Sequence, residues 1–540
     1  MTRANVALAV LAALAAALAI AFTWQAGLAS LYDDSVFYLM MAQAMSPFGH
    51  ASAAVLDAAP FDTYPPFLPV LIALGGGAFD WRIAHAIVAL AFGASVFLLG
   101  RHARLVTGSA ALGFAAALVY AFMPGAWLNV KGILSEFPYL ALSFGALALY
   151  ESGRGKPPST RRGIALGLLL AALLLTRSVG VALIAAIAAC EAWSWWRVRE
   201  RSRLGQLAWI VGLPLAIQLA WIVLRPSSGA DAYAEFGSRV AQAASGGGLE
   251  WALSMANANT SALVDAWLNA LLIFWGEWWK PKFLLAAFIG AVGLGAMLWR
   301  ALRGEVDGLY FVAFLAIVLL WPFPGQMFRL ALPVIPLVLV GAFWAWQRLL
   351  ARYTPDFTHR APWVAVLPLA LCVPPMVFYI FERARTPEEA ATDWRKADIA
   401  EFYRVPSGPS AAANAVAQIE VFRDLERIRE ATPEGARVLW YSPAYVALLA
   451  GRHGARLERP ADSAALAAQV RGTRADYIYL ANLHPRDSAH RLGHPLDPVA
   501  LAEPFARVVW RRSSPGGEVQ AVLLAVDGAR LPKENNTNKP

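Results

Sequence analysis

Long apolar segments recur through the first 381 residues of this chain, and each is close to the length of a membrane-spanning helix. The hydrocarbon core of a bilayer is about 30 Å thick and needs about 20 apolar residues per helix. Eleven segments meet this description, at residues 5–25, 83–100, 110–124, 133–150, 163–176, 179–195, 207–224, 283–299, 309–321, 330–346 and 362–381. The pattern predicts an all-α polytopic membrane domain over residues 1–381.

The composition agrees with that prediction. Hydrophobic residues make up 58% of the 540 residues and charged residues 15%, whereas soluble proteins average about 45–50% and about 25%. The apolar excess is spread over most of the chain, which excludes a single soluble enzyme, a disordered protein and a disulfide scaffold. Both cysteines, Cys190 and Cys372, lie in apolar runs without metal-ligand spacing. Small residues at 27–29 would suit signal-peptide cleavage, but the segment length and the later spans favour a retained first helix.

The distribution of Lys and Arg predicts the orientation. With the N-terminus in the cytoplasm, inner loops hold sixteen basic residues and outer positions before residue 382 hold eight. The positive-inside rule favours this arrangement, with outer loops at 26–82 and 225–282. The net charge of +9 is therefore read as a topology signal rather than a sign of nucleic-acid binding. The Trp-rich stretch 267–279 is predicted to be an interfacial helix.

The chain changes character after residue 381, where charge rises and the long apolar runs stop. Residues 382–530 are predicted to form a small α/β domain on the outer, periplasmic face. The expected elements are helices at 416–431 and 464–470, strands at 437–441 and 476–480, and a hairpin of 505–511 with 519–526. Residues 531–540 are polar and predicted to be disordered. No internal repeat is visible, which disfavours repeat-built transporters.

Ionisable residues collect at the predicted outer membrane face. Each alone has an ordinary structural explanation, such as a helix cap, a turn, a solvated loop charge or a snorkelling side chain. They occur in five short motifs: Asp33-Asp34, Asp62-Thr63-Tyr64-Pro65-Pro66, Lys131 to Glu136, Thr176-Arg177 and Arg329. Together they suit transfer from a phosphate-bearing lipid. Arginine binds phosphate oxygens bidentately, and a carboxylate can take the proton of an acceptor hydroxyl.

At these motifs the chain resembles the GT-C glycosyltransferases, and most of all the branch of protein O-mannosyltransferases and the lipid A aminoarabinose transferase. The resemblance covers residues 1–381, with the motifs in the family's order. The matching residues are Asp33-Asp34 with Tyr38 and Ala42, Tyr64-Pro65-Pro66, Ser135-Glu136-Phe137-Pro138, Thr176-Arg177 with Gly180, and Arg329 with Leu332-Pro333 and Pro336. The outer α/β tail is a weaker match to those of bacterial members.

The resemblance implies an inverting transferase that uses a polyprenyl-phosphate sugar donor. It implies that Asp33 is the catalytic base, that Asp34 orients the acceptor or a metal, and that Glu136 is a further catalytic acidic residue. Donor phosphate would be bound by Arg177, Arg329 and Lys131. Tyr38, Asp62 and Tyr64 are expected in the substrate cavity.

Some expectations stay open. A divalent cation, Mg²⁺ or Mn²⁺, is a candidate cofactor, but the sequence offers no decisive ligand set. Asp34 stands where many relatives have Glu, and Tyr64 where many have Lys, so the aminoarabinose specificity does not transfer directly. The acceptor could be a glycan, a lipid or a protein. The expected location is the bacterial inner membrane, in contact with membrane lipids.

Two other functions compete with this one. The first is a polyprenyl-linked glycan polymerase, ligase or flippase, which would also need outer arginines for its diphosphate-linked lipid. The second is a structural membrane protein whose outer domain carries the function. Donor cleavage distinguishes the first from a transferase, and tolerance of substitutions at Arg177 and Arg329 would favour the second.

Overall fold

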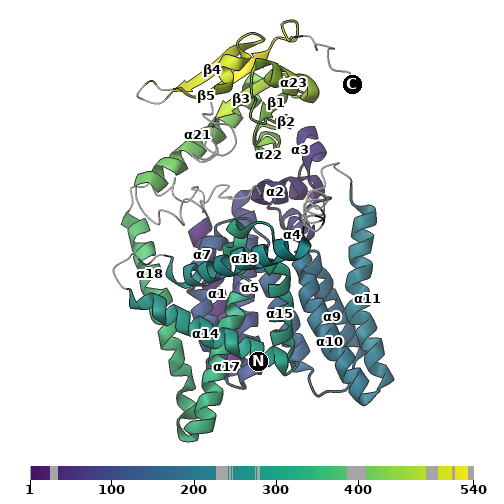
Figure 1. Cartoon of the computed structure of the whole chain (residues 1–540), viewed down its shortest axis with the longest axis vertical. Coiled ribbons are helices and arrows are strands. Elements are labelled where there is room, and N and C mark those ends of the chain that lie inside the picture. The colour runs from purple at the N-terminus through teal and green to yellow at the C-terminus, as the bar shows by residue number, and fades with distance from the viewer. Residues whose placement is uncertain are drawn as a thin grey trace. The chain divides into compact units, whose positions relative to one another are not determined.

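The computed structural model describes residues 2–24, 34–226, 241, 245, 247–273, 275, 280–385, 409–481, 497–513, 517 and 519–532. Asp33 and the tail from residue 533, about which the sequence made predictions, lie outside these described residues. The chain divides into two compact units (Figure 1). The first comprises Met1–Gln25, Phe61–Leu71 and Arg82–Thr386; the second comprises Ala26–Pro60, Ile72–Trp81 and Pro387–Pro540.

All the secondary structure in the described residues of the first unit is helical. Its longer elements are α1 (Arg3–Thr23), α5 (Trp81–Thr107), α6 (Ala110–Ala121), α8 (Glu136–Ser152), α9 (Thr160–Leu174), α10 (Val181–Val198), α11 (Arg201–Leu224), α13 (Gly248–Leu272), α14 (Pro281–Leu302), α15 (Val306–Leu319), α17 (Ile335–Tyr353) and α18 (Val366–Arg385). Shorter pieces connect them, among them α4 (Phe67–Leu74), α7 (Pro124–Val130) and α16 (Met327–Leu330), with the 3₁₀ turns η1 (Ser178–Gly180), η2 (Pro324–Gln326) and η3 (Pro355–Ala365).

Each of the eleven predicted apolar segments coincides with a helix or a bent helix pair. Within the described residues, six helices are long and apolar enough to cross a membrane. Two bent pairs, α6 with α7 at 55° and the segment Pro324–Leu330 with α17 at 60°, would bring the number to eight. The protein is therefore a multi-pass membrane protein, while the count of eleven spans stays a prediction. The stretch 267–279 is predicted to be an interfacial helix. Its first residues, 267–272, form the end of α13, which is 25 residues long.

Small residues allow close packing between helices of the first unit. A β-carbon on Gly293 in α14 would overlap the carbonyl oxygen of Val338 in α17, and one on Gly308 in α15 would overlap the backbone of Arg300 and Ala301 in α14. Within a bilayer, helices associate through such close contact because burial of apolar surface supplies little driving force there. These glycines fix the separation of α14 from its two neighbours.

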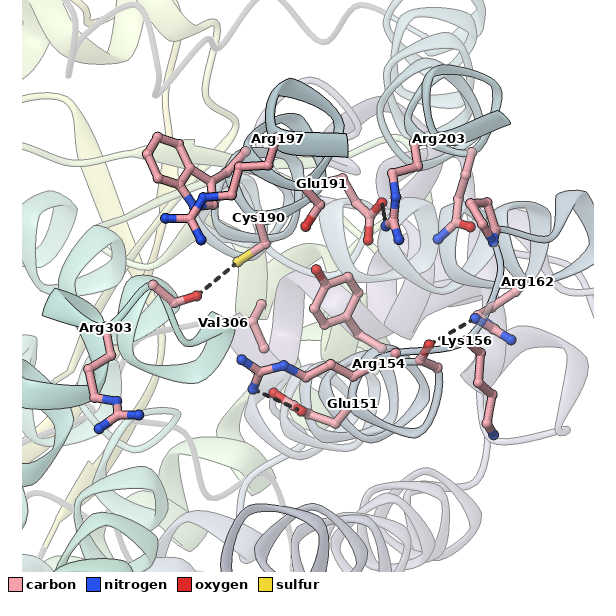
Figure 2. Close-up of a pocket in the computed structure, with 18 residues that line it drawn as sticks. Glu151, Arg154, Lys156, Arg162, Cys190, Glu191, Arg197, Arg203, Arg303 and Val306 are labelled. Carbon is pink, nitrogen blue, oxygen red and sulfur yellow. Dashed lines mark hydrogen bonds and ion pairs between the residues drawn. The ribbon is translucent and has the colours of Figure 1, made fainter. Parts of the chain in front are cut away.

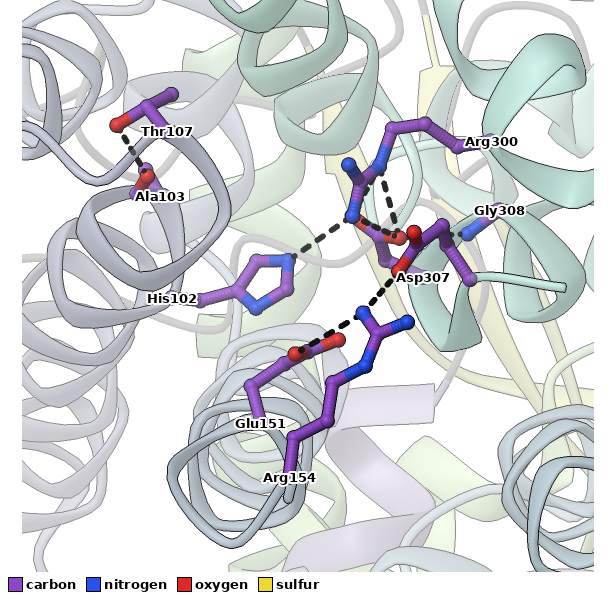
Figure 3. Close-up of polar contacts among 9 residues, drawn as sticks. His102, Ala103, Thr107, Glu151, Arg154, Arg300, Asp307 and Gly308 are labelled. Carbon is purple, nitrogen blue, oxygen red and sulfur yellow. Dashed lines mark hydrogen bonds and ion pairs between the residues drawn. The ribbon is translucent and has the colours of Figure 1, made fainter. Parts of the chain in front are cut away.

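A buried charge network also ties α5, α14 and α15 together (Figure 3). The Nε of Arg300 donates to both carboxylate oxygens of Asp307 over 3.0 Å, and Nη2 donates to Oδ1 over 2.8 Å. His102 Nε2 lies 3.5 Å from Asp307 Oδ2, and neither the histidine nor the aspartate side chain is exposed. Nearby, Arg154 pairs with Glu305 and lies 3.7 Å from Glu151 at the end of α8. A buried charge without a partner is costly, so this pairing fixes the register of the three helices.

The second unit contains a five-stranded mixed sheet in the order β2-β1-β3-β5-β4. Strands β1 (Arg437–Trp440), β2 (His453–Arg456) and β3 (Tyr477–Ala481) are parallel, and β4 (Ala506–Ser513) pairs antiparallel with β5 (Val519–Val526). The predicted strands, the hairpin and the helices now labelled α21 (Pro409–Ala431) and α23 (Ser463–Thr473) are confirmed. Strand β2 was not predicted, because its residues His-Gly-Ala-Arg carry no apolar alternation.

A buried polar cluster joins α21 to this sheet. Asp424 on α21 accepts hydrogen bonds from the Tyr479 hydroxyl over 2.8 Å and from Arg512 Nε over 2.9 Å. Tyr479 also packs against Trp440, with ring centroids 5.0 Å apart. Burial, with the neighbouring Asp424 charge, raises the pKa of Tyr479 well above its usual value. The hydroxyl therefore stays protonated and remains a donor to Asp424.

The second unit also includes part of the first predicted outer loop. Helices α2 (Asp34–Met45) and α3 (Ala53–Ala58) belong to it. Asp57 on α3 lies 3.5 Å from His453 Nδ1 at the start of β2. Residues far apart in sequence thus form one compact unit. The predicted domain boundaries at 381 and 530 stay a prediction.

Candidate functional site

The centre of the candidate site is Glu136, the first residue of α8. Acidic residues are favoured in the first turn of a helix because the macrodipole is positive there. The preceding residue, Ser135, makes no side-chain capping bond. The Glu136 side chain is fully buried, so its charge requires partners within the protein.

Two arginines from distant parts of the chain supply those partners. Arg177 Nη1 donates to Glu136 Oε1 over 2.5 Å, and Arg329 Nε donates to the same oxygen. The arginine side chains are 13% and 12% exposed. Two cationic side chains therefore meet at one carboxylate oxygen. Glu136 Oε2 is buried and has no hydrogen-bond partner among the described residues.

Local chain geometry explains why both arginines reach Glu136. Arg177 is extended, with φ −155° and ψ 134°, between the end of α9 and the turn η1. Arg329 lies on the four-residue helix α16, just before the bend that leads into α17. Gly125 on α7 lets Ala270 and Phe328 approach closely, which holds α16 against α7 and α13.

Lys131 is the third predicted phosphate-binding cation. It follows α7 as its C-terminal cap and is 1% exposed. The alternative that Lys131 is a solvated loop charge is therefore wrong. An ammonium group buried in this way needs compensating partners within the protein. The structure places it in the same helical unit as Glu136, five residues earlier in the chain.

The predicted cavity residues Asp62 and Tyr64 also belong to the first unit. The backbone carbonyl of Asp62 accepts a hydrogen bond from Arg225 Nη1, and its side chain is 6% exposed. The N–H of Phe67, just after Tyr64-Pro65-Pro66, donates to the carbonyl of Leu175 over 3.0 Å. The double-proline segment therefore enters α4 beside the chain that carries Arg177.

Two further predicted residues lie in the second unit. Asp34 begins α2 and is 7% exposed, and Tyr38 follows one turn later and is 3% exposed. Asp33, the predicted base, lies outside the described residues. The structure thus brings together Glu136, Arg177 and Arg329, while the roles of the predicted site residues stay predictions.

Sequence analysis missed a tyrosine pair next to this cluster. Tyr139 is three residues after Glu136 on α8 and therefore lies on the same helix face. Its hydroxyl is 3.1 Å from the hydroxyl of Tyr310 on α15, and both residues are fully buried. The i, i+3 spacing could have identified Tyr139. Tyr310 is 171 residues away, and no signal in the sequence links it to the site.

A divalent cation does not fit at Glu136, because the two guanidinium groups bound to its Oε1 would repel a cation. Within the part of the chain that the structure describes, no group of three or more His, Cys, Asp or Glu residues could hold a metal ion. A cation at Asp33-Asp34 stays a prediction.

Comparison with known proteins identifies the fold. No family model and no curated protein sequence matches the chain. Its structure is similar to that of ArnT from Cupriavidus metallidurans, solved in the apo state and bound to undecaprenyl phosphate. The bound form has a TM-score of 0.52 at 14% identity, over 97% of this chain and 99% of that one; the apo form has the same score and identity over 97% and 98%.

A second neighbour is the Archaeoglobus fulgidus oligosaccharyltransferase, solved with a tethered acceptor peptide. Its TM-score is 0.52 at 14% identity, over 98% of this chain and 74% of that one. Both neighbours are GT-C glycosyltransferases, and the match covers nearly all of this chain, including the small C-terminal sheet. The chain has the GT-C fold, as its sequence motifs indicated.

Proposed function

We propose that the protein is an integral-membrane inverting glycosyltransferase, which moves a sugar from a polyprenyl-phosphate donor to a hydroxyl acceptor. The observation that carries this proposal is the Glu136–Arg177–Arg329 cluster, in which two guanidinium groups from distant parts of the chain meet at one buried carboxylate oxygen. Two guanidinium groups held this close together are suited to bind an anion such as phosphate. The GT-C fold, shared with a protein solved in complex with undecaprenyl phosphate, favours a lipid phosphate as that anion.

Each arginine of the cluster would act on the phosphate. A guanidinium group has five N–H donors, and Glu136 uses one from Arg177 in the described contacts. The others can bind phosphate oxygens while Glu136 holds the guanidinium groups in place. As the bond to the sugar breaks, negative charge grows on the leaving phosphate, and fixed cations stabilise it. Lys131 would add a further positive charge.

The reaction that we propose is a single displacement. A carboxylate, assigned to Asp33, accepts the proton of the acceptor hydroxyl, and the acceptor oxygen attacks the anomeric carbon of the sugar. The carbon–oxygen bond to phosphate breaks, and polyprenyl phosphate leaves. Attack from the face opposite the leaving group inverts the anomeric configuration. Asp34 would orient the acceptor or a metal, and Tyr38, Asp62 and Tyr64 would line the substrate cavity.

The proposed location is the outer face of the bacterial inner membrane, with the N-terminus in the cytoplasm. Residues 1–381 would form the catalytic membrane domain and residues 382–530 a periplasmic domain. The distribution of basic residues over the loops supports this orientation. The acceptor is a glycan, a lipid or a protein.

The test is donor turnover by the full-length protein in proteoliposomes. A panel of radiolabelled undecaprenyl-phosphate hexoses and pentoses is supplied with a bacterial envelope extract as acceptor, and released undecaprenyl phosphate is measured. Cleavage that is abolished by Asp33→Asn supports the proposal. Full activity in that variant would contradict the base assignment. Movement of the labelled lipid across the bilayer without cleavage would favour the alternative, a flippase.

A further inference from the structure

A second polar site lies at the other end of α8. There a cavity of about 280 Å³ is formed by the ends of α8, α10 and α14 and the beginnings of α9, α11 and α15. Six cationic side chains line it: Arg154, Lys156, Arg162, Arg197, Arg203 and Arg303. Figure 2 shows Arg197 and Arg203 facing Arg154 across the cavity, with Arg303 and Lys156 on opposite sides.

The lining carries more positive than negative charge. Among the described residues that form it, the carboxylates are Glu151 and Glu191. Glu191 lies 3.6 Å from Arg203, and Glu151 lies 3.7 Å from Arg154. Each of these two arginines also has a carboxylate neighbour outside the lining, since Glu200 lies 3.6 Å from Arg203 and Glu305 pairs with Arg154. The side chains of Lys156 and Arg303 make no hydrogen bond or ion pair with the described residues. The cavity therefore has cationic groups available for an anionic ligand.

The cavity also carries the aromatic residues that are typical of a membrane interface. Trp193 lines it and stacks on Trp196, with ring centroids 5.3 Å apart, and both side chains are about half exposed. Arg197 lies over the Trp193 ring at 4.8 Å. Tryptophan is enriched where a membrane helix meets the headgroups. The 17 residues of α8 separate this end from Glu136 by about 24 Å, which is close to the thickness of the hydrocarbon core.

We propose that this cavity binds the phosphate headgroup of an anionic membrane phospholipid, on the membrane face opposite the Glu136 cluster. Its volume is near the lower end of the range for small-molecule pockets, which suits a headgroup better than a whole lipid. Arginine and lysine are the side chains that bind phosphate best. The acyl chains would remain in the bilayer beside the exposed tryptophans of α10.

The positive-inside rule explains the number of basic residues in these loops but not their arrangement. Orientation in the membrane depends on how many Lys and Arg residues each loop carries. It does not require side chains from three separate loops to surround one cavity, as they do here. The convergence of these positive charges on one cavity therefore indicates a binding site for an anionic ligand. This inference does not depend on the proposed glycosyltransferase activity.

The experiment uses the purified full-length protein in a neutral detergent. Binding of dioctanoyl phosphatidylglycerol, dioctanoyl phosphatidylcholine and inorganic pyrophosphate is measured by native mass spectrometry and by the shift in thermal midpoint. The test variant is Lys156→Gln with Arg303→Gln, which removes two cations whose side chains have no partner among the described residues. The control is Arg348→Gln with Arg352→Gln, two exposed cations outside the cavity lining.

We expect phosphatidylglycerol to bind and to stabilise the protein, and phosphatidylcholine to bind far more weakly. Loss of two interfacial cations should weaken phosphatidylglycerol binding about 30-fold, whereas the control should bind like the unmodified protein. Equal binding by the test variant and the unmodified protein would overturn the proposal. Equal binding of both lipids would do the same. Tight binding of pyrophosphate without lipid binding would identify a soluble anion as the ligand and contradict a lipid site.

Discussion

Arg177 and Glu136, 41 residues apart in the sequence, form a direct ion pair in which Nη1 lies 2.5 Å from Oε1. Arg329, 193 residues from Glu136, binds the same oxygen. Three separate segments of the chain thus meet at one buried carboxylate. Two guanidinium groups that meet at one point are suited to bind a further negative group such as phosphate. Substitutions of Arg177 and of Glu136 test the two partners of this ion pair separately.

Arg177→Gln should reduce donor turnover by about 10²–10³-fold, because the leaving phosphate loses a fixed cationic donor. Arg177→Lys should retain part of the activity, since it keeps the charge but loses the planar fork. The measurement is release of undecaprenyl phosphate in proteoliposomes. Arg352→Gln, an exposed arginine at the end of α17, is the matched control. Unchanged turnover in Arg177→Gln would show that this residue does not bind the leaving phosphate.

Glu136→Gln should destabilise the protein by about 3–5 kcal/mol, because two largely buried guanidinium groups lose the charge of a shared, fully buried carboxylate partner. Undecaprenyl phosphate should then raise the thermal midpoint of the variant more than that of the unmodified protein, since its phosphate replaces the missing anion. Thermal unfolding in detergent, with and without this lipid, measures both effects. A variant that is equally stable without lipid, or that gains nothing from it, would contradict the role of Glu136.

The sequence was sufficient to predict the helical segments, because a bilayer demands long apolar runs and such runs are visible without a structure. It also identified Glu136, Arg177 and Arg329, because charges beside apolar segments are rare. Their convergence on one oxygen could not be derived, since it depends on how α8, α9 and α16 pack together. The family resemblance implied only that Glu136 belongs to the cavity and that Arg177 and Arg329 bind donor phosphate.

Other features left no signal in the sequence. The Arg300–Asp307–His102 network joins three helices through residues that each look like ordinary loop or helix-end charges. Strand β2 has neither apolar alternation nor β-branched residues. The cavity at the end of α8 arises only when loops from different parts of the chain meet. Such features depend on tertiary packing rather than on local pattern.

Gly308→Ala should destabilise the first unit by about 1–3 kcal/mol, because a β-carbon there would overlap the backbone of α14 and force the helices apart. The same shift would disturb the Arg300–Asp307 pair. Gly295→Ala on α14 is the control, since no described atom lies within 4 Å of the position that its β-carbon would occupy, and alanine favours the helix. Thermal midpoints in detergent should separate the two variants. Equal midpoints would mean that α14 and α15 tolerate a wider separation.

Tyr479→Phe should destabilise the C-terminal sheet by about 1.5–3 kcal/mol, because the buried carboxylate of Asp424 loses the hydrogen bond that the tyrosine hydroxyl donates to it. The raised pKa of Tyr479 also predicts a pH dependence. An ordinary tyrosine ionises near pH 10 in the unfolded chain. The contribution of Tyr479 is therefore complete below about pH 10 and is lost as the pH rises towards the folded-state value.

Pulse proteolysis of the full-length protein with proteinase K, at pH 8 and pH 11, measures both effects. Peptides from β3 and β5 identified by mass spectrometry report on the sheet. The unmodified protein should lose more protection between the two pH values than Tyr479→Phe, because the variant has no hydroxyl to ionise at this position. The difference between the two proteins isolates Tyr479 from the other tyrosines, which titrate in both. An identical loss of protection in both would show that the Tyr479–Asp424 contact does not contribute to alkaline stability.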